Sequence, residues 1–165
     1  MTDSSILIAQ ESESAFVKVI GKGSFKNAKL LKDFSETVRK EGITRFILDL
    51  QLCKHMDSTF MGVLAGLASE QKKHEGDPPK VVHLSGRNRE LLETLGLDKV
   101  LTLGDDSEEG SDKDYEQLKT LNEESKEEAA KTMLEAHENL IEADQRNATK
   151  FQDVVKFLRH KLDSQ

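Results

Sequence analysis

Residues 45–64 read RFILDLQLCKHMDSTFMGVL and contain two patterns in succession. The run 45–50 is almost continuously apolar, which is typical of a β-strand buried on both faces, so we expect it at the centre of a sheet. The run 57–71 begins with Asp57, a good helix N-cap residue, and is followed by the Gly-Asp-Pro-Pro stretch 76–79, which predicts a helix between them. A buried strand that leads into a helix indicates an α/β sheet with parallel strands.

The flanking sequence extends this alternation over the first hundred residues. Two short runs rich in β-branched and aromatic residues, 6–9 and 16–20, predict a pair of strands. The further predicted elements are a helix over 28–38 that stops at Gly42, a strand over 80–85, a helix over 88–95 that ends at Gly96, and an extended segment over 100–103. The expected fold is α/β, in the order β-β-α-β-α-β-α-β, with helices packed against the sheet.

Charge divides the chain of 165 residues into two parts. Residues 1–103 carry 15 Lys and Arg against 14 Asp and Glu, whereas residues 104–165 carry 9 against 17. Between them, residues 104–112 are rich in Gly, Ser and acidic side chains and have no apolar face. We therefore expect a domain over 1–103, an acidic linker over 104–114 and a helical extension over 115–165. An exposed connector is the simpler interpretation of the linker, and the alternatives are a mimic of nucleic acid or a docking site for a basic partner.

The C-terminal extension has the pattern of one long helix or a helical hairpin. Residues 115–162 contain neither Gly nor Pro, and an apolar residue recurs every seven positions from Leu134 to Leu162. Such a stripe must be covered by the chain's own domain, by a second copy in a homodimer, or by a partner. Polar groups on a packing seam usually fix its register, and three lie along or beside this stripe: His137, Asp144 and Asn147.

The composition argues against several classes of function. No apolar run approaches the roughly 18 residues that a membrane-spanning helix needs, and residues 1–5 lack the features of a secretory signal, so we expect a cytoplasmic protein with no membrane partner. The net charge of −7 disfavours binding to nucleic acid. Cys53 is the single cysteine and is expected in the core, and no Cys/His spacing predicts a metal site. Residues 21–24 lack the spacing of a phosphate-binding loop, and no catalytic constellation stands out, so we expect neither a cofactor nor enzymatic activity.

Ser58, between the central strand and the following helix, has two interpretations. As a cap or first-turn residue, its hydroxyl would bond a free amide of the helix. The same position would expose a hydroxyl at the edge of the sheet, where ligands of open α/β sheets bind. A phosphate there would add close to two negative charges at the positive end of the helix dipole and would change any interface that includes it.

The run 46–50, followed by Asp57-Ser58-Thr59 and the run 62–64, resembles the signature of STAS domains, the fold of bacterial anti-sigma factor antagonists. The resemblance extends over about residues 5–103. It implies that Ser58 is phosphorylated by a partner that is both an anti-sigma factor and a serine kinase, and that Asp57 helps to present it. It also implies that phosphorylation ends binding to that partner and that a phosphatase restores it.

The resemblance also implies a set of partner-binding residues, which are Gly23, Ser24, Asp57, Ser58, Thr59, Phe60 and Met61. Two of these stretches depart from the family pattern. Phe60 and Met61 stand where the family usually has Gly-Leu, and Ser24 stands where it commonly has an aspartate that supports kinase docking. A phenylalanine at position 60 is either part of the core or in contact with the partner. STAS domains also occur without a phosphorylated serine, so the alternative is a constitutive adaptor or scaffold that assembles through its C-terminal helix. The retained Asp57-Ser58-Thr59 favours the regulated class.

Overall fold

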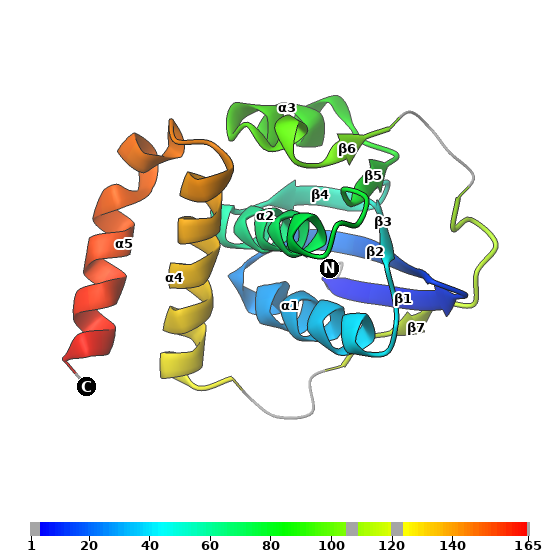
Figure 1. The fold of residues 1–165 in the computed structure, drawn as a ribbon, viewed down its shortest axis with the longest axis horizontal. Helices are drawn as coiled ribbons and strands as arrows, with labels where there is room; N and C mark the ends of the chain where they lie inside the picture. The colour runs from blue at the N-terminus through cyan, green and yellow to red at the C-terminus, as the bar shows by residue number, and fades with distance from the viewer. Residues whose placement is uncertain (1–3, 105–108, 120–123, 165) are drawn as a thin grey trace.

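The computed structural model describes residues 4–104, 109–119 and 124–164, and the sheet at its centre is shown in Figure 1. Its strands are β1 (Ser5–Glu11), β2 (Ser14–Gly23), β3 (Arg45–Asp49), β4 (Cys53–Met56), β5 (Lys80–Val82), β6 (Thr102–Leu103) and β7 (Glu116–Gln117). The helices are α1 (Phe25–Lys40), α2 (Ser58–Lys73), α3 (Gly86–Thr94), the short 3-10 helix η1 (Leu97–Lys99), α4 (Lys126–Ala143) and α5 (Asn147–Asp163). The predicted α/β fold is confirmed.

The strand order is β6-β5-β3-β2-β1-β7, and β4 pairs with the end of β2. β1 runs antiparallel to both of its neighbours, while β2, β3, β5 and β6 are mutually parallel. β3 lies inside the sheet, as its apolar sequence predicted. Phe46 and Leu48 belong to the main core, whereas Ile47, which points to the other face, belongs to a separate small cluster. The strand is therefore buried on both faces.

The segment that follows β6 differs from the predicted exposed linker. Residues 105–108 lie outside the described residues, but Gly110 is buried and accepts a hydrogen bond from the hydroxyl of Tyr115. The ammonium group of Lys113 lies 5.2 Å from the ring centroid of Phe16 on β2, and that of Lys18 lies 4.4 Å from the ring of Tyr115. These cation–π contacts hold the segment against the sheet.

The helical extension also begins later than predicted, at Lys126 instead of residue 115. Residues 116–117 form β7 and pair with β1, because Tyr115 is held on the sheet. Ser125 then caps α4: its hydroxyl accepts from the amide of Glu128, and the Glu128 carboxylate accepts from the amide of Ser125. Of the two predicted alternatives, one long helix or a helical hairpin, the structure has the hairpin, since α4 and α5 are two helices joined by a short turn (Figure 1).

The hairpin packs on its own domain. α4 contacts α2 extensively, and α5 packs on α4 (Figure 1). Leu140 of α4 is fully buried and belongs to the same cluster as the residues of the sheet. Of the three arrangements that the apolar stripe left open, this structure shows cover by the chain's own domain.

Polar residues at the turn between α4 and α5 fix the position of that turn, as their place along the apolar stripe predicted. The side chain of Asn147 is 1% exposed and donates to the carbonyls of Leu95 and Leu140. The Asp144 carboxylate accepts from the side chain and amide of Arg146 and from Lys99. Arg146, together with Lys99, holds the pKa of the Asp144 carboxyl well below its usual range.

Replacing this carboxylate should make the stability of the chain less dependent on pH. Because the folded-state pKa of Asp144 is depressed, its ion pairs stabilise the fold above the unfolded-state value of about 3.9 and are lost as the pH falls through the lower folded-state value. We expect Asp144→Asn to unfold at lower urea concentration at pH 7, with a difference from the wild type that shrinks below about pH 4. Asp153→Asn, at an exposed position on α5, is the control. A difference that stays constant with pH would mean that the charge is not the cause.

Candidate functional site

Asp57 joins the N-terminal ends of two helices. One carboxylate oxygen accepts from the amide of Phe60 and caps α2, while the other accepts from the amide of Phe25, the first residue of α1; both distances are 2.9 Å. The amide of Asp57 in turn donates to the carbonyl of Gly23. A carboxylate in this position is favoured by both helix dipoles. Asp57 therefore fixes the geometry of the sheet edge on which Ser58 lies.

Ser58 is the first residue of α2, and its hydroxyl does not serve as the cap. Its Oγ lies 2.9 Å from Nε2 of His137 on α4. Ser58 is half-buried, and His137 is 5% exposed. The expectation of a freely exposed hydroxyl is thus wrong for this conformation, because α4 covers it. The interpretation of Ser58 as a helix cap is also wrong, because Asp57 takes that role.

The His137 imidazole is held from both sides. Its Nδ1 lies 2.6 Å from the carbonyl oxygen of Met133, and its ring meets the ring of Phe151 on α5 edge to face, with centroids 5.0 Å apart. Local sequence patterns do not reveal this contact, because Ser58 and His137 are 79 residues apart. The available signal was a polar residue on an apolar helix stripe.

The remaining predicted site residues divide into surface and core. Ser24 is half-buried, and its hydroxyl caps α1 by accepting from the amide of Lys26. Gly23 is buried on the ring of Phe60, where a Cβ at position 23 would lie 2.5 Å from a ring carbon. The side chains of Thr59, Phe60 and Met61 are all buried. They support the site from inside the fold, and their contact with a partner stays a prediction.

Two exposed apolar side chains that the sequence did not single out lie just after the carboxyl ends of β2 and β3. Phe25 is 46% exposed and directly follows Ser24, and Leu52 is 58% exposed on the connection between β3 and β4. β2 and β3 are parallel neighbours, and the carbonyl of Leu52 accepts from the amide of Gly21 at the end of β2.

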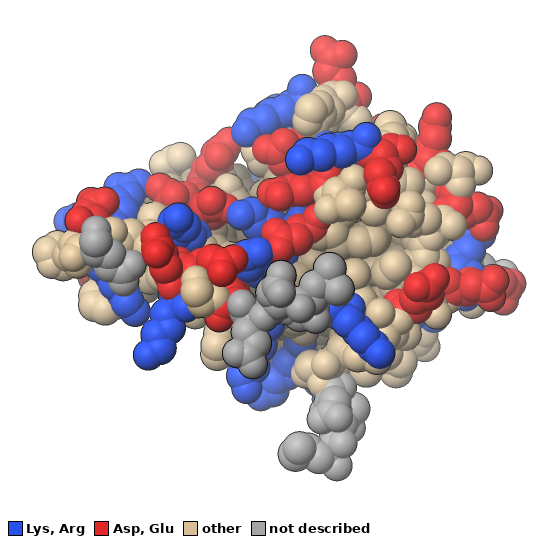
Figure 2. Space-filling view, turned by 90° about the horizontal axis from the view of Figure 1, so that it is seen from below, with Lys and Arg blue, Asp and Glu red and all other residues tan. Residues whose placement is uncertain are grey.

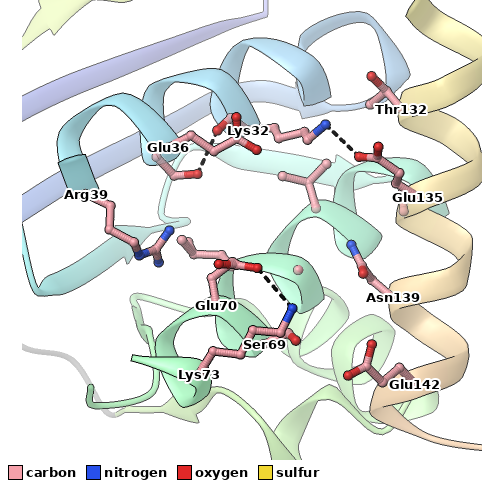
Figure 3. Close-up of a pocket in the computed structure, with 15 residues that line it drawn as sticks. Lys32, Glu36, Arg39, Ser69, Glu70, Lys73, Thr132, Glu135, Asn139 and Glu142 are labelled. Carbon is pink, nitrogen blue, oxygen red and sulfur yellow. Dashed lines mark hydrogen bonds and ion pairs between the residues drawn. The ribbon is translucent and has the colours of Figure 1, made fainter. Parts of the chain in front are cut away.

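A charged groove borders the contact between α2 and α4 (Figure 3). It lies between α1, α2 and α4, and Lys32 of α1 forms an ion pair with Glu135 of α4 at 2.6 Å. Arg39, Glu70 and Glu142 point into the same space. Its volume of about 200 Å³ is below the roughly 300–1,000 Å³ of a typical small-molecule site. Figure 2 shows acidic and basic side chains interspersed on the face of the molecule that it presents.

Within the described part of the chain, no group of three or more His, Cys, Asp or Glu side chains is placed to hold a metal ion. Cys53 is buried, as predicted, and burial raises the pKa of its thiol, so it is not an activated nucleophile. Among the same residues, the helices are too short or too polar to span a bilayer.

The sequence model of the family described as STAS domain matches residues 6–110, so α4 and α5 lie outside the match. No curated protein matches the chain.

Several solved structures share the fold at low sequence identity. The anti-sigma factor antagonist SpoIIAA in its unphosphorylated form is 16% identical, with a TM-score of 0.54 over 64% of this chain and 93% of that one. The phosphorylated form of SpoIIAA, a Bacillus cell fate determinant, is 18% identical, with a TM-score of 0.53 over 64% and 95%. An anti-sigma factor antagonist from Mycobacterium paratuberculosis is 22% identical, with a TM-score of 0.53 over 61% and 85%.

Proposed function

This chain belongs to the STAS domain family, and from that membership we propose that it is an anti-sigma factor antagonist, a protein-binding module that phosphorylation of Ser58 switches off. The observation that carries the proposal is the placement of Asp57 and Ser58 at the start of α2, at the sheet edge formed by β2, β3 and β4. The chain acts by binding and not by catalysis. Its place of action is the bacterial cytoplasm.

The local electrostatics explain how a phosphate would act there. A phosphoserine adds close to two negative charges at the N-terminus of α2, where the helix dipole stabilises them, so the STAS domain keeps its own fold. The same charges would lie next to the Asp57 carboxylate. A partner that buries this edge must then desolvate three negative charges in place of one, and binding weakens.

The partners follow from this switch. The unphosphorylated chain binds an anti-sigma factor that is also a serine kinase, with Asp57, Ser58 and Ser24 at the centre of the contact and Phe25 and Leu52 at its border. The kinase transfers a phosphoryl group from ATP to the Ser58 hydroxyl, and a phosphatase removes it. Neither nucleic acid nor a membrane takes part.

Binding to the kinase should depend on the charge at position 58. We expect Ser58→Asp to weaken the affinity for the cognate anti-sigma factor kinase at least about tenfold, since each factor of ten corresponds to about 1.4 kcal/mol of lost binding free energy. Ser58→Ala should keep the affinity and lose the phosphorylation site that mass spectrometry maps on the wild type. Thr37→Asp, an exposed position towards the other end of α1, adds the same charge as a control. Calorimetric titration measures all four proteins, and full affinity of Ser58→Asp would refute the switch.

The second candidate function is a constitutive STAS adaptor that assembles through its C-terminal helices. The observation that favours it is the exposed apolar surface of α5, where Phe157 is 66% and Val154 is 39% exposed. The two candidates differ in Ser58. Incubation with ATP and the cognate kinase leaves Ser58 unmodified if the chain is an adaptor, and converts it to phosphoserine if the chain is an antagonist.

A further inference from the structure

The contact between α2 and α4 is built from small residues on one face of α2. We call this contact the seam, and its residues are Ser58, Gly62 and Gly66 of α2 with Ala136, His137 and Asn139 of α4. Residues 58, 62 and 66 are spaced by four, so they lie along one side of the helix. The opposite side of α2 packs on the sheet with the fully buried Phe60 and Leu64. The seam is therefore a second layer of packing over the candidate site.

We propose that α4 is an intramolecular cover of this site, and that the kinase reaches Ser58 only after α4 has left the seam. The inference rests on the proposed function for the identity of the kinase. The cover itself is a property of this chain and can be tested without any partner. It explains what the C-terminal hairpin, which lies outside the matched STAS region, contributes to the protein.

The hydrogen bond between Ser58 and His137 engages the group that would be modified. The carbonyl of Met133 can only accept, so Nδ1 of His137 carries the hydrogen that this 2.6 Å contact requires. In the neutral imidazole Nε2 is then an acceptor, and the Ser58 hydroxyl donates to it across 2.9 Å. The Ser58 hydroxyl is thus hydrogen-bonded to a buried imidazole.

The backbones of the two helices approach so closely at Gly62 that no side chain fits. A Cβ at position 62 would lie 2.3 Å from the carbonyl oxygen of Ala136 and 2.6 Å from the Ala136 Cβ. Neither atom can move without moving α4. At Gly66, one turn later, a Cβ would lie 2.5 Å from the side-chain nitrogen Nδ2 of Asn139. This atom is the end of a flexible side chain, so it can move aside.

A phosphoryl group on Ser58 is incompatible with this packing. The group adds three oxygens beyond Oγ, on the side where Nε2 of His137 already lies at hydrogen-bond distance. His137 cannot withdraw, because Phe151 packs against its ring and Met133 holds its other nitrogen. Closure by α4 and phosphorylation of Ser58 therefore exclude one another.

Weak, solvent-exposed contacts border the seam on the side of α1. On the side of α1, the groove of Figure 3 is lined by charged side chains, and two exposed ion pairs, Lys29–Glu128 and Lys32–Glu135, link α4 to α1. Exposed pairs of this kind contribute little to stability. These two pairs therefore add little to the closure of α4 over α2.

The experiment measures access to position 58 with a thiol probe in the full-length chain. Ser58→Cys introduces a thiol, and Cys53, the single native cysteine, is buried with a raised pKa, so its background alkylation by iodoacetamide is slow. The Ser58→Cys chain is compared with chains that also carry Gly62→Ala or the matched control Gly66→Ala. Both alanines bring the same gain in helix propensity. Circular dichroism checks that each chain is folded.

We expect Gly62→Ala to raise the alkylation rate at position 58 about tenfold, and Gly66→Ala to change it less than about twofold. His137→Ala adds no atom to the seam and should raise the rate as well, so it gives the same reading if Gly62→Ala fails to fold. Equal rates in the Gly62→Ala and Gly66→Ala chains, or a thiol that reacts as fast in the Ser58→Cys chain as in urea, would overturn the cover. A second assay follows phosphorylation of Ser58 by the kinase in the wild type and in Gly62→Ala. If alkylation responds as expected but the kinase modifies neither chain, the cover stands and the proposed function fails.

Discussion

Replacing Phe60 with alanine is expected to lower the free energy of unfolding by about 3–5 kcal/mol. The ring is fully buried between α2 and the sheet, and it lies directly beneath Gly23 at the end of β2. Its removal leaves a cavity under the loop that carries Ser24, and this loop is too tightly connected to Asp57 to collapse into the space. Urea denaturation followed by circular dichroism measures the loss.

Phe157→Ala is the matched control for this substitution. Phe157 is 66% exposed on α5, and its removal should change the free energy of unfolding by no more than about 0.5 kcal/mol. A similar small loss for Phe60→Ala would show that Phe60 lies at the surface in solution. The residue would then be available to a partner, as the sequence had suggested.

Leu140→Ala is expected to cost about 2–5 kcal/mol of the free energy of unfolding. Leu140 is fully buried, and it joins α4 to the main core that includes residues of the sheet. Because the core is shared, the hairpin and the STAS domain should unfold in a single transition monitored by circular dichroism. The Leu140 side chain is buried only while α4 is closed over α2. The measured loss is therefore a lower bound on the free energy of that closure.

Leu134→Ala tests whether the loss arises from burial. Leu134 lies on the same helix and is only half-buried, so the same truncation should cost clearly less. Equal losses for the two variants would contradict the assignment of Leu140 to the core. A separate early transition in the wild type would show that the hairpin does not share that core.

The central part of the fold could be predicted because local patterns determine it. Strand 45–49 is apolar on both faces, and α2 starts at a residue preceded by a strong N-cap, so neither depends on distant contacts. β4 could not be predicted from the sequence, because Cys53–Met56 has no strand pattern of its own. It forms because Gly21–Gly23 of β2 offers it a parallel partner. The late start of α4 was missed for a similar reason, since Tyr115 is held on the sheet by contacts that its neighbours in sequence do not reveal.

The candidate site was predicted in its residues but not in its surroundings. Asp57 and Ser58 could be located from the strand and helix patterns around them. The apolar stripe of the C-terminal region showed that it needed cover, but nothing local identified α2 as the element beneath it. The small residues at 58, 62 and 66 let a second helix approach α2 closely, but they do not indicate which helix does so. His137 could not be paired with Ser58 from sequence, since their contact depends on the packing of the whole hairpin.

The short strand β7 has a consequence for how copies of this protein behave at high concentration. Gln117 and Glu116 pair with Leu7 and Ile8, and the amide of Leu118 donates to the carbonyl of Ile6. An uncovered outer strand is a template on which another molecule can add a strand, which is how many proteins begin to aggregate. Here the backbone of Leu7 and Ile8 in β1 is already paired with β7, and one of the two residues of β7 is Glu116. A very short outer strand that carries a charged side chain disfavours the addition of a further strand at this margin of the sheet.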